Sequence, residues 1–192
     1  MSALILTFGP THSGKTTFAK KLQALLKEQT KSILIDNDVI DEFVENNFGN
    51  LRTDPDVLKT RTPTNPDLRL RIPQLIADYA LAENYNVIIA ASHSRHVIRQ
   101  KYYDIAKRHK AKVVLLMFRT PEEELVKRIQ ASNRKTGVLL HTNSFVEFLE
   151  QQKRFLEEPT ATEKSRCFKV FEIEPGNTDS TLTTLGSDTG LL

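Results

Sequence analysis

Residues 9–16 read Gly-Pro-Thr-His-Ser-Gly-Lys-Thr, and this octapeptide constrains the fold more than any other part of the chain. It follows a short apolar run, 3–8, and precedes a segment in which apolar residues from Phe18 to Leu26 repeat at helical spacing. A glycine at each end of the loop permits backbone conformations that a Cβ would hinder. The stretch therefore predicts a strand, a tight glycine loop and an amphipathic helix, in that order.

The octapeptide also matches the pattern G-x-x-x-x-G-K-[ST], whose backbone N–H groups surround nucleotide phosphates. The positive end of the following helix would face the same phosphates. Lys15 is expected to reach the β- and γ-phosphates of ATP or GTP, and the Thr16 hydroxyl to ligate Mg²⁺. A chance match is disfavoured by the strand before the loop and the helix after it. The residues predicted to bind the nucleotide are Gly9, Thr11, His12, Ser13, Gly14, Lys15, Thr16 and Thr17.

Short apolar runs alternate with helical patterns along the rest of the chain, which predicts an α/β fold with a parallel sheet and helices on both faces. The runs are almost continuously apolar because both faces of a parallel sheet are covered. Five strands are predicted, at residues 3–8, 33–36, 87–91, 112–118 and 168–173. Together they describe a three-layer P-loop NTPase fold around a parallel five-stranded sheet.

The helices between these strands are expected to bury apolar stripes and to begin at capping residues. Their predicted buried positions are Ile72, Leu75, Ile76 and Tyr79 in one helix, Ile98, Tyr102 and Ile105 in the next, and Phe145, Phe148, Leu149 and Phe155 in a third. Pro73 must start or kink the first of these helices. Thr120 with Glu123, and Ser144 with Glu147, have the spacing of capping boxes.

The composition indicates which partners and which cellular compartment suit the chain. The formal charge is +3, a mild excess that suits an anionic substrate but does not require a nucleic-acid surface. The single cysteine, Cys167, cannot form an internal disulfide, so nothing requires an oxidising compartment. No apolar stretch has the length to cross a bilayer, and the first residues lack the basic segment and cleavage site of a signal peptide. We therefore expect a cytoplasmic protein with no membrane association and no obligate protein partner.

Asp36, Asn37 and Asp38 follow the second predicted strand, at the sheet edge where ligands of open α/β folds bind. With the second strand beside the first, Asp36 or Asp38 would approach the γ-phosphate. A carboxylate there can accept the proton of an attacking hydroxyl or help to hold Mg²⁺. The alternative is that Asn37 or Asp38 caps the helix that follows. The nearby glycine loop favours the functional interpretation, with Asp38 preferred over Asp36.

Residues 128–137 are rich in basic side chains and lie between two predicted helices. Arginines on a mobile flap can neutralise the charge of a transferring phosphoryl group, and Arg128 and Arg134 are the candidates. Gly137 would give the flap its freedom. On spacing alone, a solvated helix end is the simpler interpretation, because basic residues favour the last turn of a helix.

The order of these segments resembles the small P-loop kinases that group with 5′-hydroxyl polynucleotide kinases, zeta-toxin-like kinases, chloramphenicol phosphotransferase and adenylylsulfate kinases, among them AAA-type predicted kinases. The resemblance covers about residues 3–173, and segments 87–93 and 125–128 look most like the polynucleotide kinase branch. It implies a catalytic or binding role for each matching residue. Lys15 and Thr16 would serve the phosphates and Mg²⁺, Asp38 would be the general base, and Arg128 and Arg134 would belong to a small lid at about 134–143.

Two positions depart from that family. An Asp usually follows the third strand, where this chain has Ala90 and Ala91, so Asp36 is expected to join Thr16 in holding Mg²⁺. An Arg usually lies three residues after the general base to hold an acidic substrate group, and here that position is Asp41. These departures leave the substrate open and are compatible with weakened catalysis.

A basic stretch begins after the third predicted strand, with His93, Arg95, His96 and Arg99. An arginine at the start of this helix could meet a substrate phosphate. A solvated basic helix face that continues to Lys112 is the favoured interpretation. The spacing of the histidines does not suggest a zinc site.

The length of 192 residues suits one domain. Residues 1–174 are expected to form the kinase domain, within which 49–66 is a long connection near the substrate side. Residues 175–192, rich in Gly, Ser and Thr, are expected to form a loosely ordered tail.

The leading hypothesis is an ATP- and Mg²⁺-dependent phosphotransferase that moves the γ-phosphate to a hydroxyl on a small-molecule alcohol or on a polynucleotide 5′ end. The alternative is a nucleotide-dependent binding or switch protein with weak or no kinase activity. The two departures favour the alternative slightly. The absence of an Asn-Lys-x-Asp run argues against a switch that reads guanine.

Overall fold

The computed structural model describes residues 2–48, 68–133 and 144–189. In this part of the chain, five parallel strands form one sheet in the order β2-β3-β1-β4-β5. The strands are β1 (Ala3–Phe8), β2 (Ser32–Asp36), β3 (Asn86–Ala90), β4 (Lys112–Phe118) and β5 (Lys169–Ile173). All five predicted strands are confirmed, as is the parallel sheet.

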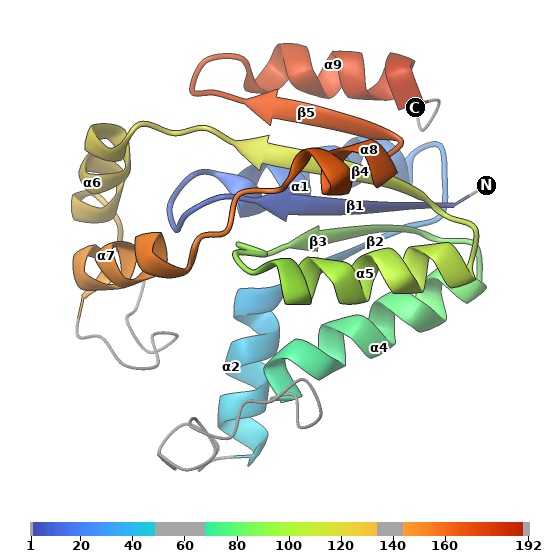
Figure 1. Cartoon of the computed structure of the whole chain (residues 1–192), viewed down its shortest axis with the longest axis horizontal. Coiled ribbons are helices and arrows are strands. Elements are labelled where there is room, and N and C mark those ends of the chain that lie inside the picture. Colours follow the sequence, from blue (N-terminus) through green and yellow to red (C-terminus); the bar gives the residue numbers. More distant parts are fainter. Residues whose placement is uncertain (1, 49–67, 134–143, 190–192) are drawn as a thin grey trace.

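Helices cover both faces of the sheet, which confirms the three-layer fold (Figure 1). One face carries α1 (Lys15–Lys27) and α9 (Thr178–Thr189), and the other carries α4 (Leu68–Ala82) and α5 (His96–Arg108). The remaining described helices are α2 (Asn37–Phe48), α6 (Glu122–Gln130), α7 (Phe145–Phe155) and α8 (Ala161–Arg166). α6 and α7 stand together at the end of the sheet where β1 leads into the glycine loop (Figure 1).

Successive side chains of each strand point to opposite faces of the sheet, so the core has two halves. In β1, Leu4 and Leu6 face α4 and α5, whereas Ala3 and Ile5 face α1 and α9. All four side chains are fully buried because β1 is central and covered on both sides. A third apolar cluster joins α6 to α7 through Leu125, Ile129, Phe145 and Leu149.

The strand order corrects the expectation that the second strand lies beside the first. β3 stands between β2 and β1, with Leu6 opposite Ile89 and Asp36 opposite Ala90. All five residues of β3 are buried, while three of the five in β2 are only partly buried. The more apolar strand therefore takes the interior position and β2 takes the edge.

The predicted buried face of α4 is wrong. Leu75, Ile76 and Tyr79 are 50%, 37% and 71% exposed. The buried positions of the helix are Arg69, Pro73, Gln74, Ala77, Ala80 and Leu81. Alanines weigh little in an apolar pattern, yet their small side chains let a helix backbone approach the sheet closely. Pro73 lies inside α4 and does not start it.

Two other helix predictions are corrected and one is confirmed. α6 begins at Glu122 without a side-chain cap, and the Thr120 hydroxyl donates instead to the Ser13 carbonyl oxygen at 3.4 Å. Ser144 does cap α7, accepting the Glu147 N–H at 3.2 Å, although Phe155 in this helix is 50% exposed. The segment expected to be a loose tail forms α9, whose Leu182 and Leu185 are buried against the sheet.

The predicted connection at 49–66 and the predicted lid at 134–143 lie outside the described residues. Among the described helices, none combines the length and the apolar character needed to span a membrane.

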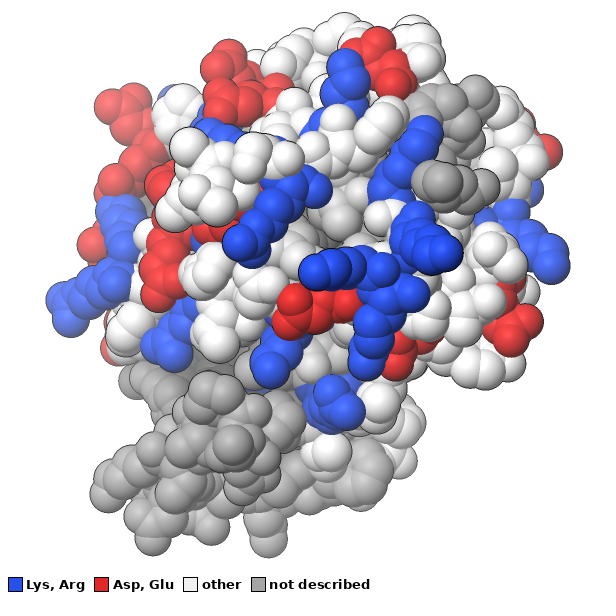
Figure 2. Space-filling view, turned by 45° about the vertical axis from the view of Figure 1, so that its right-hand side comes forward, with Lys and Arg blue, Asp and Glu red and all other residues white. Residues whose placement is uncertain are grey.

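Lys and Arg side chains gather on the face that carries the carboxyl half of α5 (Figure 2).

Candidate functional site: the glycine loop and its supports

The glycine loop between β1 and α1 takes backbone conformations that require its glycines. Gly9 has a φ of 145°, and a Cβ there would lie 3.0 Å from the Phe118 Cβ and 3.1 Å from the Phe118 carbonyl oxygen. Gly14, the N-cap of α1, has a φ of 96°. His12 also has a positive φ, 57°. The loop thus leads directly into the amino end of α1, where free backbone N–H groups favour an anion.

Lys15 lies in the first turn of α1 and folds back along this loop. Its Nζ donates to the Pro10 carbonyl oxygen and, at 3.2 Å, to the Ser13 Oγ. Thr16, beside it in the same turn, is half-buried, and Thr17 is exposed. The predicted nucleotide-binding residues therefore lie together on one loop and one helical turn, at the carboxyl end of β1.

Side chains from α6 and α7 hold the outer part of the loop. Gln152 in α7 is buried, and its Oε1 accepts the Thr11 N–H at 2.7 Å. Arg128 in α6 donates from Nη1 to the His12 carbonyl oxygen at 3.4 Å. The His12 ring packs edge-on against Phe145 with ring centroids 4.7 Å apart. Both helices that flank residues 134–143 therefore contact the glycine loop.

Arg128, the first of the two predicted lid arginines, lies beside the glycine loop. Its Nη1 comes within 3.7 Å of the point where a Gly14 Cβ would be, so the guanidinium lies over the loop. Its Nε donates to Glu124 Oε1 at 2.8 Å, one helical turn earlier. This ion pair aligns the arginine along α6. The second predicted arginine, Arg134, lies outside the described residues.

Sequence reasoning missed Gln152, although a signal was present. Gln152 follows Phe145 by seven residues and Leu149 by three, which places it on the buried stripe of α7. A polar side chain on such a stripe must find a hydrogen-bond partner inside the protein. The pattern could identify the position but not the partner, which is 141 residues away in the chain.

The segment that follows β3 lies against the other side of the loop. Gly9 N–H donates to the Ser92 carbonyl oxygen at 3.3 Å, and the Thr7 hydroxyl donates to the Ala91 carbonyl oxygen at 2.7 Å. Because β3 is the neighbour of β1, Ala91, Ser92 and His93 border the glycine loop, where the resembled family usually has an Asp. Residues 91–93 themselves carry no carboxylate.

His93 is a buried support of this junction. Its Nδ1–H donates to the Thr7 carbonyl oxygen at 2.6 Å, and its φ of 43° is unusual for a residue with a side chain. Burial lowers the pKa of His93 to about 4, and the positive charges of Arg99 and Lys15 act in the same direction, while the bond to Thr7 opposes them. The ring is therefore neutral near pH 7 and has a structural role.

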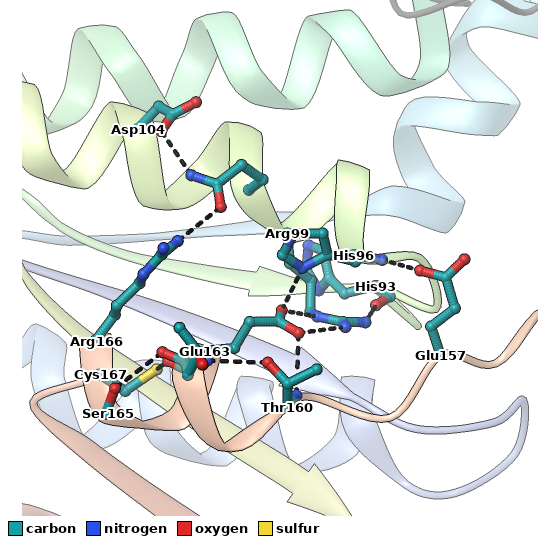
Figure 3. A network of polar contacts seen from close by, with 12 residues as sticks. His93, His96, Arg99, Asp104, Glu157, Thr160, Glu163, Ser165, Arg166 and Cys167 are labelled. Carbon is teal, nitrogen blue, oxygen red and sulfur yellow. Dashed lines mark hydrogen bonds and ion pairs between the residues drawn. The ribbon is translucent and has the colours of Figure 1, made fainter.

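Arg99 is fully buried and is not available to a substrate phosphate, nor does it belong to a solvated face. Its Nε and Nη2 donate to the two carboxylate oxygens of Glu163 at 2.7 and 3.1 Å, and its Nη1 donates to the His93 carbonyl oxygen at 2.8 Å (Figure 3). Its guanidinium also lies over the Phe8 ring, 5.4 Å from the centroid. One arginine thus joins α5, α8, the β3–α5 loop and the last residue of β1.

Glu163 anchors the opposite side of this network. It forms a capping box with Thr160 at the start of α8, and its Oε1 lies 3.1 Å from His96 Nδ1 (Figure 3). Burial by itself would raise the pKa of Glu163, but hydrogen bonds from Arg99, Thr160 and His96 lower it to about 2. Glu163 is therefore charged, which balances the buried charge of Arg99.

The two predicted carboxylates lie half-buried at the carboxyl end of β2. Asp36 Oδ1 accepts the Asp38 N–H at 3.2 Å, so Asp36 caps α2. The capping role expected of Asn37 or Asp38 belongs to Asp36. Asp38 lies in the first turn of α2. Both carboxylates are one strand farther from β1 than expected, because β3 intervenes.

Comparisons with known proteins bear on the family and the fold of the chain. The model of an AAA domain family matches residues 4–159. No curated protein sequence matches the chain.

Solved structures share the fold at low sequence identity. A sugar kinase from Janibacter sp. has a TM-score of 0.65 and 15% identity, with 100% of this chain and 96% of that chain covered. A putative kinase from Chloroflexus aurantiacus has a TM-score of 0.69 and 13% identity, with coverage of 98% and 96%. Kti12 from Chaetomium thermophilum, solved with ADP-AlF3, has a TM-score of 0.63 and 18% identity, with coverage of 96% and 98%. The fold is therefore that of small P-loop kinases.

Proposed function

Because the chain belongs to the AAA domain family that matches residues 4–159, we propose that it is an ATP-dependent phosphotransferase that moves the γ-phosphate to a hydroxyl acceptor. The acceptor is a small-molecule alcohol or the 5′-hydroxyl of a polynucleotide. One observation carries this proposal. The glycine loop, Lys15 and the Arg128 guanidinium meet at the carboxyl end of β1, within a fold shared with small kinases.

The chemistry follows from what phosphoryl transfer requires. Charge spreads over the oxygens of the transferring group, and fixed cations stabilise it. Lys15 would move from the Pro10 carbonyl to the β- and γ-phosphates when ATP occupies the loop. Arg128, already over the loop, would face the transferring group from the side of α6.

We expect Mg²⁺ to accompany the nucleotide at this site. Within the described residues, no group of three or more His, Cys, Asp or Glu side chains could hold a metal ion. Mg²⁺ bound to a nucleotide needs no such group, because phosphates and water fill most of its coordination positions. The Thr16 hydroxyl and a carboxylate oxygen of Asp36, through water, would hold it. When bound, Mg²⁺ would neutralise charge on the β- and γ-oxygens.

Asp38 is the proposed general base. A base must lie within hydrogen-bond reach of the acceptor hydroxyl, directly or through one water. Asp38 lies in the first turn of α2, at the carboxyl ends of the strands, where the glycine loop also lies. Its half-buried carboxylate is compatible with a bound alcohol, and its backbone is positioned by Asp36.

An acceptor screen tests the reaction class. The protein is incubated with γ-labelled ATP and 5′-hydroxyl oligonucleotides, nucleosides, sugars or aminoglycoside-like alcohols, with Lys15→Ala as the inactive control. We expect label transfer to one class, and none with Lys15→Ala. Tight ATP binding without any labelled acceptor would contradict the proposal.

Asp38→Asn separates chemistry from nucleotide binding. We expect ATP affinity to stay near the wild-type value while phosphotransfer falls about 100-fold or more, as for loss of a general base. Asp41→Asn removes the same charge one turn farther along α2 and should leave transfer largely intact. Full activity of Asp38→Asn would exclude its role as base.

A nucleotide-dependent switch is the second candidate. It is favoured by the residues after β3, since Ala91, Ser92 and His93 border the loop without a carboxylate. A switch would bind ATP tightly, label no acceptor and change partner affinity on hydrolysis. The same acceptor screen, read beside ATP binding, distinguishes the two.

A further inference from the structure

The positive charge of this protein is concentrated in one stretch. Seven of the 27 Lys and Arg residues but only one of the 24 acidic residues fall between 95 and 112. This stretch therefore carries a charge of +6, and the remaining residues sum to −3. Arg99 is buried with Glu163, so it adds little to the charge of the surface. The small net positive charge of the whole chain therefore includes a large net positive charge in residues 95–112.

Two of these cations, Lys101 and Arg108, line a groove between α4 and α5. The α4–α5 groove, a cavity of about 280 Å³, is lined by Arg71, Gln74, Asp78, Lys101, Asp104 and Arg108, with Leu75 and Ile105 as its apolar part. Figure 2 turns this side of the molecule forward, and Lys and Arg side chains gather there around a smaller acidic group. Lys107 and Lys110, at the end of α5 and just after it, are exposed and extend the row of cations.

Several cations around the groove are not paired with a carboxylate in the described part of the chain. Asp78 binds Arg108 at 3.0 Å and His109 at 2.6 Å, and Asp104 accepts a hydrogen bond from Gln100 at 2.8 Å. In the ranges that the structure describes, the side chains of Arg71, Lys101, Lys107 and Lys110 make no ion pair. Four cations on one face therefore remain to meet an external anion.

We infer that the α4–α5 groove and the cations around it bind a single strand of nucleic acid. A row of cations matches a phosphate backbone, to which each Lys or Arg contributes one contact. The apolar part of the groove can pack against a base. The Asp78 and Asp104 carboxylates and the Gln74 amide can pair with base amino groups and edges. A nucleotide is the ligand that supplies all three kinds of group together.

An anionic membrane is the competing partner for such a face, but the groove disfavours it. Two carboxylates among the cations would repel lipid headgroups, whereas they can accept hydrogen bonds from bases. The surface is also separate from the glycine loop, because α5 runs from the loop side of the sheet toward its opposite end (Figure 1). The inference goes beyond phosphotransfer and does not rest on it.

The test measures binding of a fluorescein-labelled single-stranded 20-mer by anisotropy between about 0.05 and 0.2 M salt. The double variant Lys101→Gln/Lys107→Gln removes two cations of α5, and the matched control Lys20→Gln/Lys27→Gln removes two exposed cations of α1 on the opposite face of the sheet. Counterion release from a single strand predicts a salt slope smaller by about 1.4 and an affinity about 25-fold weaker at 0.1 M salt for the α5 variant. The control should bind as the wild type does.

Two outcomes would overturn the inference. Equal losses in both double variants would show a response to bulk charge and not to this face. Binding of phosphatidylserine vesicles without binding of the 20-mer would assign the face to a membrane. Circular dichroism of each variant checks folding, and its ATP affinity should equal that of the wild type. Binding of the 20-mer is therefore measured independently of whether the acceptor screen detects phosphotransfer.

Discussion

Gln152 and His93 each place one polar group inside an apolar environment, and each uses it to hold the backbone beside the glycine loop. Gln152 accepts the Thr11 N–H, and His93 donates to the Thr7 carbonyl oxygen. The two bonds hold the loop from opposite sides, α7 and the β3–α5 junction. A buried amide or imidazole makes a bond of fixed geometry that water cannot replace.

Gln152→Leu tests the support from α7. The change keeps the approximate size of the side chain but leaves the Thr11 N–H without its acceptor, at a cost of about 1–3 kcal/mol. We expect a lower ATP affinity, measured by calorimetry, because the outer part of the loop is no longer held. Gln151→Leu, at the neighbouring and less buried position, is the control. Equal affinities in the two variants would contradict the role of Gln152.

His93 predicts a pH dependence of stability. Its pKa is near 6.5 in the unfolded chain and about 4 in the folded protein, so between these values the unfolded state binds more protons. The free energy of unfolding should therefore fall by about 2 kcal/mol between pH 7 and pH 5 on account of this residue. Urea unfolding of the wild type and His93→Gln at both pH values isolates the effect. A variant with the same pH dependence as the wild type would refute it.

At the scale of elements, a short helix far along the chain stabilises the start of α5. α8 has six residues, and its Glu163 receives both Arg99 and His96 from α5 (Figure 3). The link continues through Glu157, whose carboxylate accepts the His96 N–H at 2.6 Å. The β3–α5 junction that borders the glycine loop is thus held from α8 as well as from β1.

Glu163→Gln tests this link. It leaves the buried Arg99 without an opposite charge, which costs about 3–5 kcal/mol for a buried pair. The measurement is the free energy of unfolding in urea. Glu158→Gln breaks the partly exposed pair with Arg119 and should cost at most about 1 kcal/mol. Similar small losses in both variants would show that burial adds nothing to the Arg99–Glu163 pair.

At the scale of the whole molecule, the core extends beyond the predicted domain end at residue 174. α9 covers β5 with Leu182 and Leu185, which join α1 in closing one face of the sheet. Without α9, Ile173 and its apolar neighbours on this face would meet water. The described residues between Ala3 and Thr189 form one layered unit.

Leu185→Ala measures the contribution of α9. Leu185 is fully buried, and its truncation should lower the free energy of unfolding by about 2–5 kcal/mol through lost burial and a cavity. Thr184→Ala changes an exposed residue of the same helix and should have a small effect. A loosely ordered tail would make both variants equal to the wild type.

Local patterns were enough to predict several parts of this protein. The glycine loop and the five strands follow from short motifs and apolar runs, because adjacent residues decide backbone conformation and which segments are buried. Motif spacing also located the Ser144 cap. These features can be predicted without knowing which segments, far apart in the sequence, contact one another in the fold.

Only the tertiary structure decided the strand order, the partner of Arg99, the buried face of α4 and the place of α9. Thr11 and Gln152 are 141 residues apart, and Arg99 and Glu163 are 64 apart. Such pairs depend on how whole elements pack, and sequence spacing carries no record of that. The sequence by itself therefore determined a phosphate-binding loop in an α/β sheet, while packing determined which side chains support it, since burial and charge balance are properties of the assembled core.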